Sequence, residues 1–417
     1  MAATPQSKLF TPLAVNDNVQ LQHRIVLAPL TRYKADDAHV PFYPLVKEYY
    51  SQRASTPGTL LITEGTFIAV KAGGYAHVPG IWSDAQIAAW KEISASVHAK
   101  GSFIFMQLWA LGRAADYAQL QKEDPSAPYI SASDVPYSAR ASQGSPSPRP
   151  MTVDEIKEYP QLYAQAAKNA IEAGFDGVEV HSANGYLPDQ FLQPVTNKRT
   201  DAYGGSIENR SRFVLEVVDA IVNAVGAHRT AIRFSPWGNF AGASSLPPMY
   251  HSTDHLARQK WACPTPSHNS RMSSPPSRMR TPPRRSHICI SSSHARPRVQ
   301  GNVTRDPTTV GVHESNDALR AVWRSATAST GKRIVLLAGG FTKEIAEKTL
   351  KIEKEEEGER IATVFGRWFI ANPDLPVRLR DDIPLNEYDR KTFYLLGENS
   401  PRGYTDQPFA TTRNARF

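Results

Sequence analysis

Short apolar runs rich in β-branched residues alternate with helix-length amphipathic segments along most of the chain. The runs, which we predict to be strands, are Arg24–Pro29, Thr59–Glu64, Gly101–Trp109, Gly177–His181, Thr230–Ser235, Arg333–Ala338 and Ile361–Phe365. Nearly continuous apolarity, rather than alternation with polar residues, is typical of strands buried on both faces. Seven such runs separated by helical patterns predict βα units and a parallel sheet.

Two helix starts can be read from the sequence. Ser83 with Gln86, and Thr152 with Glu155, fit capping boxes, in which the side chains of the first and fourth residues bond to each other's backbone. Such caps occur in open α/β sheets and in closed barrels alike, so they leave both architectures open. The charged run Lys351–Arg360 is interpreted as a solvated helix end.

A closed barrel needs an eighth strand, and the spacing shows where it belongs. The fifth run ends near Ser235 and the next clear run begins near Arg333, which leaves room for one more βα unit. The only apolar remnant between them is 287–299, a weak candidate for the sixth strand.

The composition of this interval also explains the charge of the chain. The chain has 417 residues and a net charge of +8, which alone would suggest a nucleic-acid or membrane-surface partner. Residues 241–286 hold six Arg, one Lys and a single acid, and therefore six of those eight units. They also hold eight Pro and nine Ser, with no Val or Ile. The rest of the chain is nearly neutral, so we expect neither a nucleic-acid nor a membrane partner.

This atypical segment, 241–294, has two interpretations. A run such as Ser273–Arg285 cannot propagate a helix, because proline removes a donor and clashes with the preceding turn. The segment is either a genuine disordered insertion or the product of a shifted reading frame or misassigned intron. The second explanation accounts at once for the loss of β-branched residues and for the clustering of Arg, Ser, Pro and Cys. If the segment is real as written, the activity of the protein is in doubt.

Further features narrow the class. Two cysteines exclude a disulfide scaffold and suit a reducing compartment. No apolar run approaches the ~18 residues of a membrane span, and the first residues lack the apolar region of a signal peptide. The histidines lack metal-ligand spacing, and no G-x-G-x-x-G follows a strand. We therefore expect a cytoplasmic protein, a monomer or homodimer, with no metal and no Rossmann domain.

Polar residues and glycines gather just after the predicted strand ends. They are Pro29 and Thr31, Glu64 and Gly65, Gln107 and Trp109, His181 and Asn184, Arg233, Gly339 and Gly340, and Gly366 and Arg367. In a (β/α)8 barrel all of them would converge on the C-terminal mouth, where such enzymes work. The glycine turns after the last two strands, with a cation, match the usual phosphate site of a barrel.

The segment His181–Phe213 (HSANGYLPDQFLQPVTNKRTDAYGGSIENRSRF) resembles the Old Yellow Enzyme family of FMN-dependent NADPH dehydrogenases and ene-reductases, in its fungal form. Matching motifs include APLTR (28–32), QLWALGR (107–113), RFSPWG (233–238) and GRWFIANPDL (366–375). The resemblance covers roughly residues 5–240 and 295–410. It implies an α/β fold, a single FMN-binding (β/α)8 TIM barrel over 1–417, interrupted in its fifth-helix and sixth-strand region by the atypical segment.

The resemblance also implies how FMN is held. Thr31 would bond the flavin carbonyl near N5, Gln107 would bind the pyrimidine edge, and Arg233 would place positive charge near N1. That charge suits a reduced flavin, which is anionic and needs a fixed partner in a dry site. The other cofactor-binding residues implied are Pro29, Gly65, Gly339, Gly340, Gly366 and Arg367. Many family members have Asn where Gly340 stands.

The implied reaction takes hydride from NADPH or NADH and reduces the C=C bond of small α,β-unsaturated carbonyl compounds, in some members within secondary metabolism. His181 and Asn184 would bind the carbonyl oxygen, and Tyr186 would protonate the α-carbon. The resemblance places Tyr75, Trp109, Phe393 and Tyr394 in the substrate pocket. Two alternatives are a flavin-dependent isomerase, since some relatives have Phe in place of Tyr186, and an inactive remnant that acts at most as a binding protein.

Overall fold

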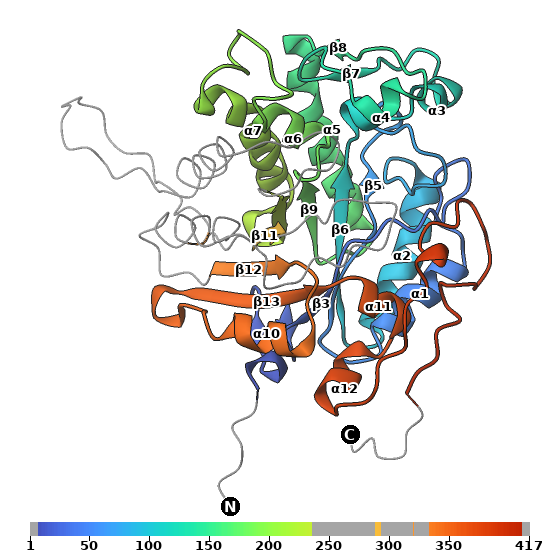
Figure 1. Cartoon of the computed structure of the whole chain (residues 1–417), viewed down its shortest axis with the longest axis vertical. Helices are drawn as coiled ribbons and strands as arrows, with labels where there is room; N and C mark the ends of the chain where they lie inside the picture. Colours follow the sequence, from blue (N-terminus) through green and yellow to red (C-terminus); the bar gives the residue numbers. More distant parts are fainter. Residues whose placement is uncertain (1–6, 236–287, 293–319, 321–332, 411–417) are drawn as a thin grey trace, which may run out of the picture.

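The centre of the protein is a barrel of parallel strands (Figure 1). The computed structural model describes residues 7–235, 288–292, 320 and 333–410. In chain order the barrel strands are β3 (Ile25–Leu27), β4 (Leu60–Ile62), β6 (Phe103–Trp109), β9 (Gly177–His181), β10 (Thr230–Phe234), β11 (Ile288–Ser292), β12 (Arg333–Ala338) and β13 (Glu359–Phe365). Each pairs in parallel with the next, and β13 pairs with β3, so the eight strands close into a ring.

The predicted α/β TIM-barrel fold is therefore confirmed, and all seven predicted runs contain a strand. The weak sixth-strand candidate also forms a strand, because β11 pairs with β10 on one side and β12 on the other, with Ile290 opposite Arg233 and Leu336. Apart from these five residues, the atypical segment 241–294 lies outside the described residues.

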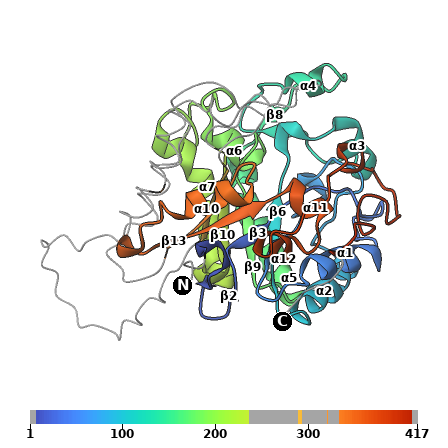
Figure 2. The same cartoon turned by 60° about the horizontal axis from the view of Figure 1, so that its bottom comes forward.

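Helices lie around the outside of the strands (Figures 1 and 2). The longer ones are α1 (Leu45–Arg53), α2 (Asp84–His98), α5 (Val153–Glu172), α7 (Ile207–Val225) and α10 (Lys343–Leu350). Shorter ones are α3 (Tyr117–Glu123), α4 (Ser138–Ala141), α6 (Leu187–Leu192), α11 (Arg367–Ala371) and α12 (Leu375–Arg380). Both predicted capping boxes are present, at the starts of α2 and α5. No helix in the described ranges is long and apolar enough to cross a membrane.

Five further strands are short. They are β1 (Leu13–Ala14), β2 (Gln20–Leu21), β5 (Thr66–Phe67), β7 (Ile130–Ser131) and β8 (Arg149–Pro150). Of these, β5 adds to the barrel sheet beside β6, whereas β1–β2 and β7–β8 form separate pairs.

The interior of the barrel is apolar toward the amino ends of the strands and polar at their carboxyl ends. Phe105, Ala231 and Leu336 belong to one buried cluster inside the ring, whereas Val178 and Val180 pack in the outer cluster. A Cβ atom at Gly177 would lie 2.6 Å from Phe105 Cζ, so this glycine makes room for the phenyl ring. Because apolar side chains fill the rest of the interior, only the end of the barrel at the carboxyl ends of the strands is left for chemistry.

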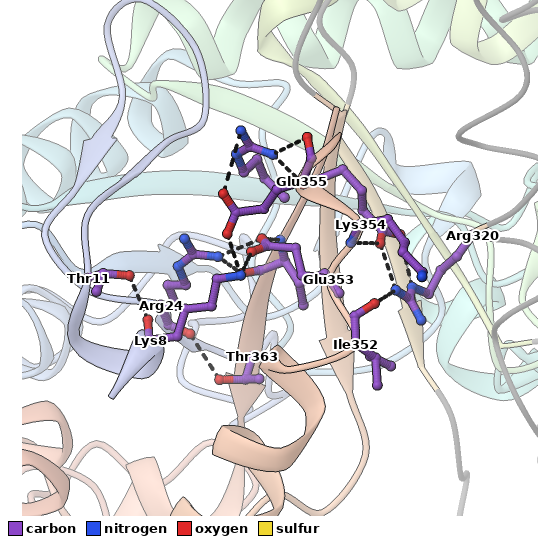
Figure 3. Close-up of polar contacts among 12 residues, drawn as sticks. Lys8, Thr11, Arg24, Arg320, Ile352, Glu353, Lys354, Glu355 and Thr363 are labelled. Carbon is purple, nitrogen blue, oxygen red and sulfur yellow. Dashed lines mark hydrogen bonds and ion pairs between the residues drawn. The ribbon is translucent and has the colours of Figure 1, made fainter. Parts of the chain in front are cut away.

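Buried ion pairs gather where β3 and β13 begin, at the opposite end from the mouth (Figure 3). Glu353 pairs with Lys8, accepts from Arg24 Nη1 at 2.6 Å, and accepts the Ile361 N–H at 2.6 Å. Glu359 accepts from Nε and Nη2 of Arg320 at 2.9 and 2.6 Å.

The interpretation of Lys351–Arg360 as a solvated helix end is therefore wrong in part. Helix α10 ends at Leu350, and the side chains of Glu353 and Glu359 are fully buried. The reason is that both carboxylates serve as acceptors for arginines from distant parts of the chain. Such pairings cannot be seen in a local charge pattern.

Candidate active site

The end of β9 forms a sharp turn that carries the proposed catalytic residues. Asn184 and Gly185 both have left-handed backbone, with φ of 57° and 74°, and Asn-Gly is the pair that adopts two such positions at least cost. The Asn184 N–H donates to Ser235 Oγ at 2.7 Å, and the Gly185 N–H donates to Asp189 Oδ2 at 2.7 Å. This turn returns the chain so that Tyr186 meets the ring of His181.

Aromatic rings pack tightly around that turn. The Trp109 and His181 rings are stacked at 5.9 Å, 15° from parallel. The Tyr186 ring lies 4.8 Å from each of them, edge-on to both. Tyr75 lies edge-on to Trp109 at 5.8 Å. A Cβ atom at Gly65 would come within 2.5 Å of Trp109 Cε3, so the position of the indole requires glycine there.

His181 is a neutral imidazole. Burial, together with the positive charge of Arg233, holds the pKa of His181 well below its ordinary value. Among the described residues its Nδ1 has no hydrogen-bond partner, although it is buried. A neutral ring with an uncommitted nitrogen can bind a carbonyl oxygen without carrying a charge of its own.

A polar layer lies next to the turn, inside the barrel. Gln107 Nε2 donates to Glu179 Oε1 at 2.6 Å, and Arg233 stands opposite His181 in the β9–β10 register. Burial raises the pKa of Glu179 to about 7, although the charge of Arg233 opposes this shift. Burial likewise lowers the pKa of Arg233, and the charge of Glu179 opposes that change.

The loop after β3 joins the site to the carboxyl-terminal segment. Arg32 donates from Nε to the Phe393 carbonyl at 3.0 Å and from Nη2 to the Gly403 carbonyl at 2.6 Å. The Tyr394 ring, half exposed, lies 6.0 Å from the ring of Tyr33. Thr31 is half-buried and directly precedes Arg32. The predicted cofactor residue Thr31 therefore lies near the predicted substrate residues Phe393 and Tyr394.

The predicted phosphate turns follow neighbouring strands. Ala338 pairs with Val364, so Gly339–Gly340 and Gly366–Arg367 leave the sheet side by side. Gly340 has φ of 72°, a backbone region that glycine adopts at little cost. A Cβ atom at Gly366 would lie 3.4 Å from Leu30 Cδ2, which places this turn beside Pro29 at the end of β3. Arg367 Nη1 donates to the Tyr388 hydroxyl at 3.1 Å.

These residues fit a bound flavin. Four buried polar atoms around the mouth lack a partner within the described part of the chain: Trp109 Nε1, Glu179 Oε2, His181 Nδ1 and Arg233 Nε. A buried polar atom without a partner costs about 1–3 kcal/mol, so a cluster of them points to missing ligands that complete it. The glycine turns and Arg367 offer backbone N–H groups and a cation, which suit a phosphate.

Several contacts of the site could not be read from the sequence. Glu64 accepts the N–H groups of Arg32 and Tyr33 at 3.0 and 3.2 Å. Gln190 donates to the carbonyls of Leu111 and Gly185 at 2.8 and 2.7 Å, and so joins the Asn184–Gly185 turn to the segment after β6. For Glu179 a signal was available, since an acid stands at an inward position of an otherwise apolar strand.

The chain is similar to known flavoproteins over nearly its whole length. Residues 8–325 match the NADH:flavin oxidoreductase / NADH oxidase family. Identity is 47% to the NADP-dependent oxidoreductase lnbE of Aspergillus flavus, with 97% of each chain covered, and 44% to the chanoclavine-I aldehyde reductase fgaOx3 of Penicillium roqueforti, with the same coverage. Identity to the probable inactive reductase easA of Epichloe festucae var. lolii is 42%, and the match covers 97% of this chain and 96% of that one.

A solved structure agrees with these relatives. The crystal structure of Old Yellow Enzyme from Pichia sp. AKU4542 superposes with a TM-score of 0.76 at 36% identity, covering 95% of this chain and 92% of that one. The agreement of family model, relatives and fold identifies the chain as an oxidoreductase that uses FMN and NAD(P)H. The chain belongs to the NADH:flavin oxidoreductase / NADH oxidase family, within its Old Yellow Enzyme branch.

Proposed function

We propose that this protein reduces the C=C bond of small α,β-unsaturated aldehydes or ketones with hydride from NADPH or NADH. The observation that carries the proposal is the meeting of His181, Asn184 and Tyr186 at one turn, against Trp109. When bound, FMN supplies the hydride chemistry between nicotinamide and alkene. The remaining work falls to the side chains of the chain itself.

The substrate carbonyl is held by neutral donors. The imidazole of His181 and the amide of Asn184 would both donate to the carbonyl oxygen. Donors aimed at one oxygen stabilise the negative charge that develops there as the alkene accepts hydride, as in an oxyanion hole. The burial that keeps His181 uncharged also strengthens this interaction, because the surroundings are poorly polarisable.

Tyr186 supplies the proton. A phenol with an ordinary pKa near ~10 is a competent acid toward an enolate-like carbon. Its ring is held edge-on between Trp109 and His181, which fixes the hydroxyl relative to the carbonyl site. A proton donor at this place favours net reduction over isomerisation.

The other residue roles in the proposal are those that the family resemblance implies. Thr31, Gln107 and Arg233 would face the flavin ring. Pro29, Gly65, Gly339, Gly340, Gly366 and Arg367 would complete the cofactor site, and Tyr75, Trp109, Phe393 and Tyr394 would line the substrate pocket. The name of the Penicillium relative refers to an aldehyde, and we extend this class to the present chain as an unsaturated aldehyde of a fungal secondary pathway.

The Tyr186→Phe variant tests the proposal. It should keep the rate at which NADPH reduces the bound flavin, but lose alkene reduction by about 10²–10⁴-fold, the usual contribution of a general acid. Stopped-flow absorbance separates the two half-reactions, with cyclohexenone as the alkene. Tyr163→Phe is the control, since Tyr163 is also a buried tyrosine but lies on α5, away from the mouth.

Other results would redirect the assignment. Unchanged enone reduction in Tyr186→Phe would remove Tyr186 from the mechanism. A product with the mass of the substrate, rather than two hydrogens more, would indicate an isomerase. A colourless protein that does not oxidise NADPH would support the inactive remnant.

A further inference from the structure

We infer that Glu179 is a positioning residue for the flavin, which fixes the amide of Gln107 and partly balances the charge of Arg233. The inference rests on the proposed function only in assigning Gln107 and Arg233 to the flavin. Glu179 itself has no part in the proton or hydride transfers proposed above.

The topology places Glu179 between the two residues it would serve. Strand β9 lies between β6 and β10 in the barrel, and Glu179 stands opposite Gln107 in one ladder and opposite Ala231 in the other. Its neighbours Val178 and Val180 pack outward against the helices, so the carboxylate lies on the inner face of the barrel. It has no exposed surface.

The contact with Gln107 fixes which way that amide points. When Glu179 is ionised, its carboxylate can only accept hydrogen bonds, and the group 2.6 Å from its Oε1 is the NH₂ of Gln107. Its carbonyl oxygen and second N–H therefore remain for another partner. With a neutral residue in place of Glu179, both orientations of the amide would be possible.

The charge of Glu179 acts on Arg233. The carboxyl of Glu179, whose pKa burial raises to about 7, interacts electrostatically with that guanidinium and carries negative charge in its ionised form. The guanidinium would stabilise the negative charge of a reduced flavin held here, and a carboxylate close by would diminish that stabilisation. Glu179 therefore holds the potential of the flavin lower than Arg233 alone would set it.

The fold alone does not require an acid at this position. Glu179 Oε2 has no hydrogen-bond partner among the described residues, and burial of a carboxylate that is only half satisfied is unfavourable. A neutral side chain of the same size would fill the space at lower cost. Local rules broken in this way are typical of functional positions.

Two substitutions separate the two roles. Glu179→Gln keeps the length but removes the charge, so the reduction potential of bound FMN should shift to a more positive value. Glu179→Asp keeps the charge but withdraws it from Gln107, so the dissociation constant of FMN should rise by about tenfold or more, as expected for loss of a charge-assisted bond. Potentials are measured by equilibration with a reference dye, and dissociation constants by FMN fluorescence titration of the protein stripped of flavin.

Glu353→Gln is the matched control. Glu353 is also a buried carboxylate paired with an arginine (Figure 3). It accepts the Ile361 N–H near the start of β13, so it lies at the end of the barrel opposite the mouth. It should lose stability without a change in either flavin property. An unshifted potential in Glu179→Gln, or the same shift in the control, would overturn the charge role. An unchanged FMN affinity in Glu179→Asp would overturn the positioning role, and this second variant stands if the first fails to fold.

Neither readout depends on the alkene. A protein that binds FMN with the expected shifts but does not reduce enones would contradict the proposed function and leave this inference standing. A protein that binds FMN and reduces enones, but with the wild-type potential and affinity in both variants, would contradict this inference alone.

Discussion

Glu64, at the carboxyl end of β4, is a buried acid whose ionisation affects folding. Burial raises its pKa from 4.5 to about 7, against the effect of the N–H groups of Arg32 and Tyr33. The folded protein therefore holds this proton more tightly than the unfolded chain does. Stability from this group is fully present below about pH 4.5 and is lost as the pH rises toward 7.

Glu64→Gln should remove that pH dependence. Glutamine can still accept the two backbone N–H groups but does not ionise. We expect the difference in unfolding free energy between wild type and variant to change by up to about 3 kcal/mol from pH 4.5 to pH 8, in favour of the variant at high pH. Urea unfolding at several pH values measures it, and a constant difference would contradict the shifted ionisation.

Residues of the site differ in how far the sequence predicts them. His181, Asn184 and Tyr186 belong to one short motif, so their proximity follows from their closeness in the sequence. The role of Arg32 could not be read in this way, because the carbonyl of Phe393 that it binds lies 361 residues away. Glu179 was visible as an acid in an apolar strand, but its partner Gln107 is 72 residues distant.

At the scale of elements, the loop after β3 fixes the segment around 390–404. Arg32 donates to three backbone carbonyls in that segment, at 3.0, 3.2 and 2.6 Å, and is almost fully buried. Its guanidinium also lies 5.0 Å from the centre of the Tyr404 ring. One side chain therefore holds the elements that carry Thr31 and Phe393.

Arg32→Met should loosen this segment. The variant leaves two buried carbonyls and one part-buried carbonyl without this donor, and each buried one costs about 1–3 kcal/mol unless water enters. We expect faster proteolytic cleavage within 390–404 and a KM for the alkene that rises more than kcat falls. Arg402→Met is the control, since Arg402 is largely exposed in the same segment. Equal cleavage of the two variants would contradict this role.

Strands and helix starts were predictable because each depends on neighbouring residues. Runs such as Thr230–Ser235 are apolar enough to identify a buried strand, and the capping boxes need only four residues. Closure of the ring was not predictable from such patterns, since it depends on β13 meeting β3, across more than 330 positions. The sixth strand was only weakly predicted, because the sequence before it lacks the helical pattern that precedes the other strands.

At the scale of the whole molecule, the two ends of the barrel serve different purposes. The mouth carries left-handed turns and several buried polar atoms without a partner among the described residues, whereas the opposite rim carries buried ion pairs around Glu353 and Glu359. Such a division is usual in TIM barrels. We infer that the ion pairs of the opposite rim stabilise the fold, whereas the residues of the mouth carry out the chemistry.

Glu353→Ala tests this division. It leaves Arg24 buried without its carboxylate, which should lower the free energy of unfolding by about 3–5 kcal/mol. Both half-reactions should be unchanged while the protein stays folded. Glu92→Ala, which removes an exposed pair with Lys47, should cost less than about 1 kcal/mol. Denaturant unfolding compares them, and equal losses would contradict the importance of the buried rim.

The Asn184–Gly185 turn also bears on chemical ageing of the protein. Asn-Gly sequences deamidate when the glycine nitrogen attacks the asparagine side-chain carbonyl, and heat accelerates this damage. Here the Gly185 N–H is held by Asp189, so the nitrogen is restrained while the turn stays closed. Opening of the turn would allow the amide proposed to bind substrate to become a carboxylate, which repels a carbonyl oxygen. Local opening of this one turn would therefore set how fast deamidation removes activity, and activity could be lost while the barrel is still folded.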